Sequence, residues 1–167
     1  MKIETRWIHV GVFVACVGLI AYAMVLQHFM DLEPCPMCIL QRYAFVGVGL
    51  LALLAAIHDR RGWGRWVYSG LIILVSSLGA GVAARHSWLE HNPPPVYDCG
   101  ADLGFVIDTF PLAEALPMIF RGTGDCTEVL WRFLGLSIAE WALIWFLIFV
   151  VVEVFLATRR EPESKST

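Results

Sequence analysis

Residues 34–42 read PCPMCILQR, so two cysteines separated by two residues stand at the start of a long apolar segment that carries an arginine. A Cys-x-x-Cys pair can close a small disulfide ring and reopen it by thiolate exchange. A nearby cation or helix N-terminus makes such a sulfur more reactive. The apolar segment that follows decides the fold, because it is long enough to be a membrane-spanning helix.

The composition is that of a membrane protein. Hydrophobic residues make up 58% of the 167 residues, and the mean hydropathy is +0.67, which is high for a soluble domain. Four apolar stretches each approach the roughly 20 residues that a helix needs to cross a bilayer, and none alternates as barrel strands do. These stretches are residues 10–29, 39–57, 66–84 and 138–157. We predict an all-α membrane protein in which a single domain forms a four-transmembrane-helix bundle.

The charges are distributed unevenly along the chain. Basic residues precede the first span, separate the second from the third, and follow the fourth: Lys2, Arg6, Arg60, Arg61, Arg65, Arg159, Arg160 and Lys165. Because basic segments remain in the cytoplasm, we predict that both termini, including the tail 158–167, are cytoplasmic. A short loop at 30–38 and a long loop at 87–135 then face outward, which in a bacterial inner membrane means the periplasm.

Four of the five cysteines fall on this outer face: Cys35, Cys38, Cys99 and Cys126. Disulfides form and persist in the periplasm. The remaining cysteine, Cys16, lies in the middle of the first span among small apolar residues, and we interpret it as a buried small hydrophobic residue.

The start of the second span gives the paired cysteines a defined register. Pro36 is tolerated in a first helical turn, so this helix should begin at or just before Cys38. Cys38 and Arg42 are then four residues apart and share a face. The helix N-terminus and the guanidinium would both favour a thiolate at Cys38. The alternative for Arg42 is a side chain that reaches the membrane surface from a helix end.

Three further features lie on or near the outer loops. His86 closes the third span and is either an interfacial hydrogen-bonding residue or a catalytic group. The broken apolar segment 105–120 is predicted to be an interfacial helix or a docking surface. Ser137 with Glu140 three positions later matches a capping box at the start of the fourth helix.

The outward cysteines allow three interpretations. A metal site is one, but Cys-x-x-Cys is only half of a zinc pattern and the other two cysteines are widely separated. Structural disulfides are another, and a bridge between Cys99 and Cys126 would contribute about 3–4 kcal/mol, whereas a Cys-x-x-Cys ring closes almost no loop. The third is transfer of electrons from one pair to the other. A four-cysteine metal site is the least favoured.

An ordered set of features resembles the DsbB family of quinone-coupled disulfide oxidoreductases. The set contains the Cys-x-x-Cys followed by Gln41 and Arg42, the proline-rich 93–95 before Cys99, GDC at 124–126, and FLGL at 133–136. The resemblance covers nearly the whole chain. The related vitamin K epoxide reductases differ, because their loop cysteines precede their Cys-x-x-Cys.

The resemblance implies a two-stage relay. Cys99 and Cys126 would form the disulfide that a reduced DsbA-like protein attacks, with Cys99 taking the mixed disulfide. Electrons would then reach Cys35 and Cys38 through a bond between Cys35 and Cys126.

The resemblance also implies a quinone cofactor, most simply ubiquinone with menaquinone as the alternative, held by Cys38, Arg42 and His86. It implies no metal and no nucleic acid. The partners would be a periplasmic DsbA-like thioredoxin-fold protein and the membrane. The alternative function is a non-catalytic membrane scaffold whose disulfide-stapled loop binds a partner through 105–120.

Overall fold

The computed structural model describes residues 5–29, 35–58, 63–93 and 131–158. Its helices are α1 (Thr5–Phe29), α2 (Pro36–His58), α3 (Trp63–His91) and α6 (Ile138–Thr158), and two short strands, β1 (Arg132–Phe133) and β2 (Leu136–Ser137), precede α6. Within these residues, four helices are long and apolar enough to cross a membrane. The predicted all-α membrane bundle is therefore confirmed. Cys99, Cys126 and the segment 105–120 lie outside the described residues.

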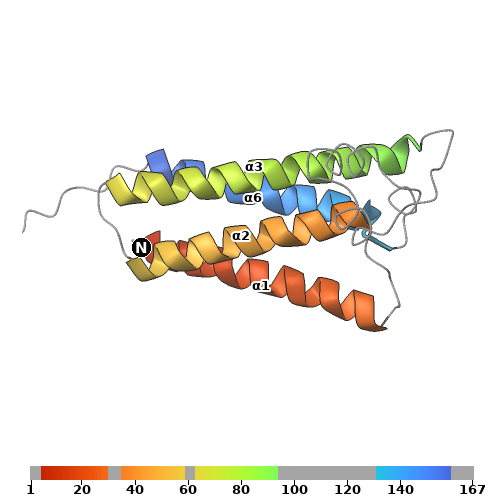
Figure 1. Cartoon of the computed structure of the whole chain (residues 1–167), viewed down its shortest axis with the longest axis horizontal. Coiled ribbons are helices and arrows are strands. Elements are labelled where there is room, and N and C mark those ends of the chain that lie inside the picture. Colours follow the sequence, from red (N-terminus) through yellow and green to blue (C-terminus); the bar gives the residue numbers. More distant parts are fainter. Residues whose placement is uncertain (1–4, 30–34, 59–62, 94–130, 159–167) are drawn as a thin grey trace, which may run out of the picture.

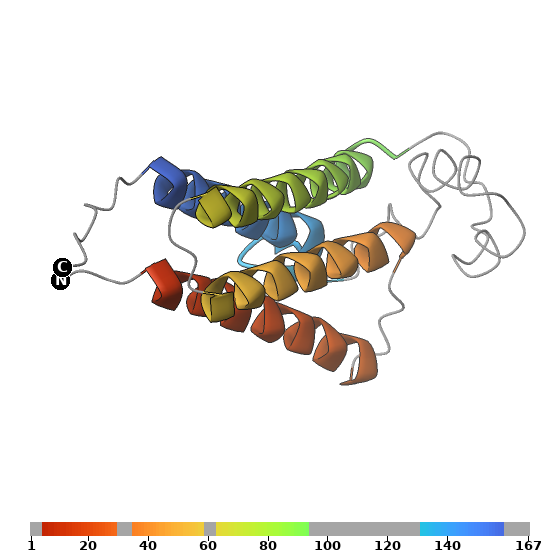
Figure 2. The same cartoon turned by 60° about the vertical axis from the view of Figure 1, so that its left-hand side comes forward.

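The four helices run along the long axis of the molecule, with α2 beside α1 and α6 beside α3 (Figures 1 and 2). The main contacts join α1 to α2, α2 to α3 and α3 to α6. The first residues of α1 and the last residues of α6 lie at one end of the bundle, and the start of α2 and the end of α3 lie at the other. The start of α2 and the end of α3 are therefore neighbours, although many residues separate them in the sequence.

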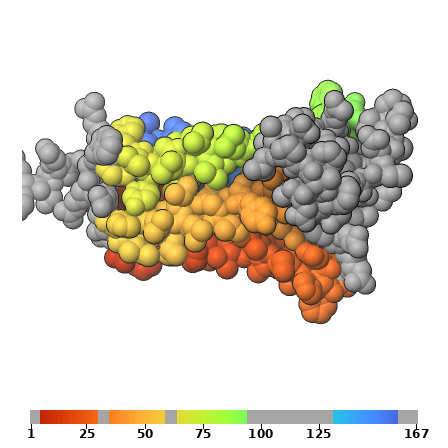
Figure 3. All heavy atoms as spheres, in the orientation of Figure 1, coloured from red at the N-terminus to blue at the C-terminus, as the bar shows by residue number. Residues whose placement is uncertain are grey.

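The core lies between the helices, and the outer faces remain apolar. The rings of Phe45 on α2 and Phe146 on α6 stack at 4.1 Å, and Phe149 meets Phe45 edge-on. Many large hydrophobic side chains are exposed, including Leu50, Leu54, Leu71, Leu74, Leu78 and Val151. Figure 3 shows one such outer face, formed largely by α2 and α3. Lipid tails cover apolar side chains of this kind in a membrane, so the pattern is expected for a spanning bundle.

Small residues set how closely the helices approach. A Cβ atom added at Gly79 on α3 would lie 2.6 Å from the ring of Phe146, so this glycine lets α6 pack directly against the α3 backbone. On the other side of the bundle, the Cβ of Cys16 lies 3.2 Å from the position that a Cβ at Gly49 would occupy. Cys16 is 1% exposed, which confirms it as a small buried residue.

The helix α3 continues beyond the end that hydropathy predicts. The apolar stretch stops at residue 84, but the helix extends to His91 and has 29 residues. At 1.5 Å per residue such a helix is about 43 Å long, longer than the roughly 30 Å hydrocarbon core. The last turns of α3 therefore reach past the apolar core and carry His86 and Glu90, and the first residues of the predicted loop 87–135 are helical.

A two-residue turn and a capping box fix the start of α6. Leu134 (φ 54°) and Gly135 (φ 84°) both have positive φ, which is typical of a tight hairpin turn between paired strands. Ser137 then caps the helix. Its backbone N–H donates to Oε2 of Glu140 at 2.8 Å, and its Oγ accepts from the Glu140 N–H at 3.3 Å. The predicted capping box is confirmed.

A buried polar pair joins the first and last helices at the opposite end of the bundle. His9 Nε2 lies 3.4 Å from Oε1 of Glu153, and the two side chains are 5% and 0% exposed. Polar side chains inside a spanning bundle are expected to pair in this way, because lipid offers them no partner. This contact helps to close the bundle between α1 and α6.

The contact at Gly79 yields a stability prediction with an internal control. Gly79→Ala should destabilise the protein by about 1–3 kcal/mol, because its methyl group collides with the Phe146 ring. Gly81→Ala, on the same helix with no atom within 4 Å of the added Cβ, should be neutral or slightly stabilising, since alanine favours helix. Thermal unfolding in detergent measures both. Equal melting temperatures for the two variants would contradict the close packing of α3 on α6.

Candidate active site

Cys35 is the residue that caps α2. Its carbonyl oxygen accepts a hydrogen bond from the Ile39 N–H at 3.1 Å, and its sulfur accepts one from the Cys38 N–H at 3.3 Å. This is the pattern of a helix N-cap, with sulfur in place of the usual side-chain oxygen. Pro36 occupies the first helical position, as its missing N–H favours. The sequence predicts that the helix N-terminus acts on the sulfur of Cys38. In the structure, an N–H of the first turn instead donates to the sulfur of Cys35.

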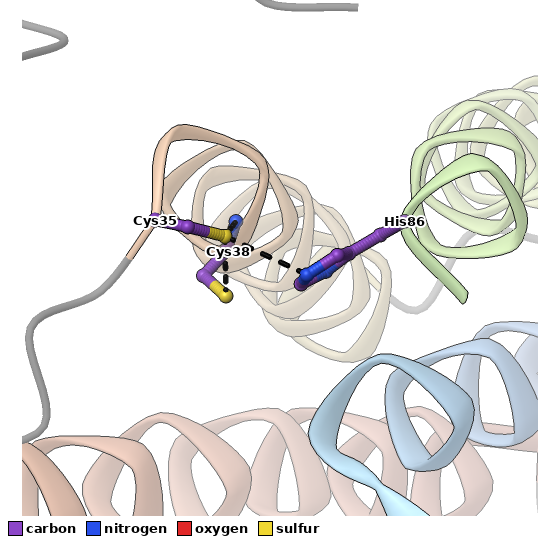
Figure 4. Close-up of side chains that lie close together, drawn as sticks. All are labelled: Cys35, Cys38 and His86. Atoms are coloured by element: carbon purple, nitrogen blue, oxygen red, sulfur yellow. Dashed lines mark hydrogen bonds between the residues drawn. The ribbon is translucent and has the colours of Figure 1, made fainter. Parts of the chain in front are cut away.

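The two sulfurs of the Cys-x-x-Cys lie close together beside a histidine from another helix. Cys35 Sγ and Cys38 Sγ are 3.0 Å apart, and Cys35 Sγ is 3.6 Å from Nε2 of His86. Figure 4 shows His86 projecting from α3 toward Cys35 at the start of α2. Cys35 is 6% exposed and His86 4% exposed, while Cys38 is only partly buried. The tertiary contact between α2 and α3 therefore gives the dithiol a buried imidazole neighbour.

Gln41 on α2 orients this imidazole through Nδ1, the ring nitrogen that does not face Cys35. Its amide nitrogen lies 3.1 Å from Nδ1 of His86, and its side chain is buried. In this orientation the amide donates to Nδ1, so the neutral ring carries its proton on Nε2. An Nε2–H directed at Cys35 can donate to a thiolate there, and hydrogen bonds to a charged acceptor are among the strong ones.

Glu90 adds a carboxylate on the same face of α3. Its Oε1 lies 3.7 Å from His86 Nε2, one helical turn away, and the two side chains are only 5% and 6% exposed. His86 is thus surrounded by a sulfur, an amide and a carboxylate. Sequence reasoning missed Gln41 and Glu90 as site residues. The available signal was a glutamine within an apolar helix, because such a side chain must find a partner.

Arg42 points toward α1. Its guanidinium donates from Nη1 to Oε1 of Gln27 at 2.6 Å and from Nη2 to the carbonyl oxygen of Ala23 at 3.4 Å. Arg42 is partly buried. Because it follows Cys38 by four residues on the same helix, it shares a face with that cysteine, as the register argument predicts. The guanidinium therefore lies between the end of α1 and the start of α2.

The structure brings three of the predicted site residues together, places a fourth nearby and does not describe the other two. Cys35, Cys38 and His86 form one cluster, and Arg42 lies one helical turn beyond Cys38. Cys99 and Cys126 lie outside the described residues. A spanning bundle with a vicinal dithiol, a buried histidine and a nearby arginine at one end defines a membrane protein of the thiol–disulfide exchange class.

Comparison with known proteins identifies the family. The family described as "Disulfide bond formation protein DsbB" matches residues 5–156. The chain is similar to a Disulfide bond formation protein B of Aromatoleum aromaticum, with 47% identity over 157 residues that cover 94% of this chain and 95% of the relative. A protein of the same description from an Azoarcus species is 50% identical over 141 residues, covering 84% and 85%. One from Marinobacter nauticus is 45% identical over 157 residues, covering 93% and 94%.

The chain therefore belongs to the DsbB family. It is a membrane thiol–disulfide oxidoreductase, and membership of this family favours the enzyme over the non-catalytic scaffold.

The contact between Cys35 and His86 predicts a change in thiol reactivity. In a protein that also carries Cys99→Ser and Cys126→Ser, His86→Ala should slow alkylation of reduced Cys35 at neutral pH by about tenfold, because a hydrogen bond to a charged sulfur is worth about 1.5–3 kcal/mol. Timed alkylation followed by peptide mass spectrometry measures the rate. His91→Ala is the control, since His91 lies on the same helix but is 60% exposed. An unchanged Cys35 rate in His86→Ala would remove the histidine from thiolate stabilisation.

Proposed function

We propose that this protein reoxidises a periplasmic DsbA-like dithiol protein and passes the electrons through two cysteine pairs to a membrane quinone. The observation that carries the proposal is the dithiol of Cys35 and Cys38, held at one end of a spanning bundle beside His86 and one turn from Arg42. The family membership supports the same assignment. Both termini are proposed to be cytoplasmic in a bacterial inner membrane, in agreement with Arg6 near the start of α1 and Arg65 near the start of α3, at the end opposite the dithiol.

The first stage is proposed to use the loop cysteines. A thiolate of the reduced partner attacks the Cys99–Cys126 disulfide at Cys99, and Cys126 leaves as a thiolate. The partner's second thiol then attacks the mixed disulfide, so the partner leaves oxidised and Cys99 is released as a thiol. Two electrons and two protons have now passed from the partner to the loop pair.

The second stage transfers the oxidising equivalent from the Cys35–Cys38 disulfide to the loop. Cys126 attacks Cys35, and Cys38 leaves as a thiolate. Cys99 then attacks Cys126, which restores the loop disulfide and releases Cys35. His86 supports the second of these steps, in which Cys35 leaves as a thiolate, because its Nε2 lies 3.6 Å from that sulfur and can donate to it.

The residues around Cys38 fit a quinone. A quinone ring needs hydrogen-bond donors for its carbonyl oxygens, apolar walls and entry from the lipid. The Arg42 guanidinium has five N–H groups and lies partly buried between α1 and α2. Phe29, the last residue of α1, and Tyr43, the residue after Arg42, are exposed aromatic side chains. A quinone held there would supply a two-electron, two-proton acceptor for the dithiol. Cys38 would be the sulfur on the Arg42 side of the pair, and the Arg42 guanidinium would stabilise negative charge on an oxygen held beside it.

We propose ubiquinone as the acceptor, with menaquinone as the alternative, and turnover with each quinone in detergent distinguishes the two.

Covalent capture tests the first stage. A DsbA variant that lacks its second active-site cysteine cannot resolve the mixed disulfide, so it should accumulate in a covalent complex with this protein. Cys99→Ser and Cys126→Ser should each abolish the complex, because neither variant retains the loop disulfide that the partner attacks, whereas Cys16→Ser should leave it unchanged. Non-reducing electrophoresis and mass spectrometry identify the linked cysteines. A complex that persists in Cys99→Ser would exclude Cys99 as the attacked residue.

Steady-state kinetics test the role of Arg42. Arg42→Ala should raise the apparent KM for quinone by about tenfold or more, the effect expected from losing a hydrogen bond from a charged donor, with little change in the KM for the DsbA-like partner. Arg132→Ala is the control, because Arg132 is exposed on β1. Equal quinone KM values for the two variants would show that Arg42 does not contact the quinone.

A further inference from the structure

The side chains of Cys35, Cys38 and His86 place three soft or borderline metal ligands within reach of one another. The two sulfurs and a ring nitrogen of His86 all lie within 4.8 Å of each other. Figure 4 shows the two cysteines at the start of α2 and His86 reaching them from α3. We propose that the reduced dithiol and His86 form a binding site for Zn²⁺, and that occupation of this site blocks the enzyme reversibly in its reduced state.

The geometry already approaches that of a zinc site. Zinc–sulfur bonds of about 2.3 Å and zinc–nitrogen bonds of about 2.1 Å at a tetrahedral angle place sulfur and nitrogen about 3.6 Å apart. Cys35 Sγ and His86 Nε2 are 3.6 Å apart. Two sulfurs on one zinc ion are about 3.8 Å apart, whereas the sulfurs of Cys35 and Cys38 are 3.0 Å apart. A rotation of the partly buried Cys38 side chain supplies the difference.

The surroundings of His86 provide the second hydrogen bond that a metal-binding histidine usually makes. Histidines that bind metal usually hold their second ring nitrogen in a hydrogen bond, and Gln41 lies 3.1 Å from Nδ1. A half-turn of the Gln41 amide exchanges its nitrogen and oxygen, so the oxygen then accepts from Nδ1–H. His86 Nε2 is left with its lone pair directed toward the sulfurs.

The carboxylate of Glu90 lies beside Nε2 of His86. Glu90 Oε1 lies 3.7 Å from His86 Nε2, and Oε2 of Glu90 is buried without a hydrogen-bond partner among the residues that the structure describes. The group of donors within 4.8 Å of one another contains Cys35, Cys38 and His86 but not Glu90, so this carboxylate would hold a water molecule that takes the fourth zinc position. The donor set is then two sulfurs, one nitrogen and one oxygen, which suits Zn²⁺ better than Mg²⁺ or Ca²⁺.

Zinc binding at this site changes no oxidation state. One Zn²⁺ replaces the protons of the two thiols, which are released to solvent, and both sulfurs bind as thiolates. A Cys35–Cys38 disulfide offers no thiolates, so the site should exist only in the reduced protein. The predicted inhibition rests on the proposed relay, because a zinc-bound dithiol cannot pass its electrons onward. Zinc affinity itself does not depend on the relay.

Binding should be measured on the full-length protein in detergent, with Cys99→Ser and Cys126→Ser so that the loop thiols do not compete. Under anaerobic, reducing conditions, Zn²⁺ titration against a chromophoric chelator should give one equivalent bound per chain. Co²⁺ in place of Zn²⁺ should show thiolate charge-transfer absorption and the visible bands of a tetrahedral site. Oxidation of the pair to the disulfide should abolish both signals.

Variants identify the ligands. His86→Ala should weaken Zn²⁺ binding at least tenfold, and Cys38→Ser should also remove part of the cobalt charge-transfer absorption. His91→Ala and Cys16→Ser should bind as the parent does. Equal affinity in His86→Ala, or equal binding by the oxidised protein, would overturn the site. The oxidised protein needs no further substitution, so this comparison holds even if His86→Ala folds poorly.

An activity measurement separates the site from its consequence. Added Zn²⁺ should inhibit turnover of the wild-type enzyme, and a chelator should restore it. If zinc binds the reduced pair as described and turnover continues unchanged, the proposed relay through Cys35 and Cys38 fails while the metal site stands. If reduced protein binds no zinc, the metal site fails and the relay is unaffected.

Discussion

The structure depends on one buried contact, in which the sulfur of Cys35 meets the first turn of α2 and the imidazole of His86. The sulfur accepts the Cys38 N–H and lies 3.6 Å from His86 Nε2. Each of these donors favours negative charge on sulfur, and burial removes the water that would otherwise compete with them. The chemistry of the dithiol therefore depends on how firmly α3 is held against α2.

Packing far from the cysteines holds α3 in its position against α2. Gly79 lets α6 approach the α3 backbone, and the stacked rings of Phe45 and Phe146 join α6 to α2. In a bilayer, lipid tails are as apolar as the helices, so close packing and polar contacts supply the attraction between them. We therefore expect that loss of these contacts would shift α3 and move His86 relative to the sulfur of Cys35.

Much of this arrangement could be predicted from particular residues. The apolar stretches predicted four spanning helices, Ser137 and Glu140 predicted a capped start for the last helix, and the position of Cys16 predicted a buried small residue. Each of these predictions depends on a local sequence pattern or on the thickness of a bilayer, and none of them requires knowledge of distant contacts. The extension of α3 to His91 was missed because hydropathy reports where a segment leaves the hydrocarbon, and a helix does not have to end there.

The sequence by itself determined that the chain spans a membrane, that two cysteines open a helix, and that Cys38 and Arg42 share a face, because helix periodicity and bilayer thickness act on neighbouring residues. Only the tertiary structure decided that His86 lies beside Cys35, that Gln41 orients its ring, and that Arg42 turns toward Gln27. These partners come from different helices. Their distances are set by the side-chain packing between the helices, which no local pattern in the sequence encodes.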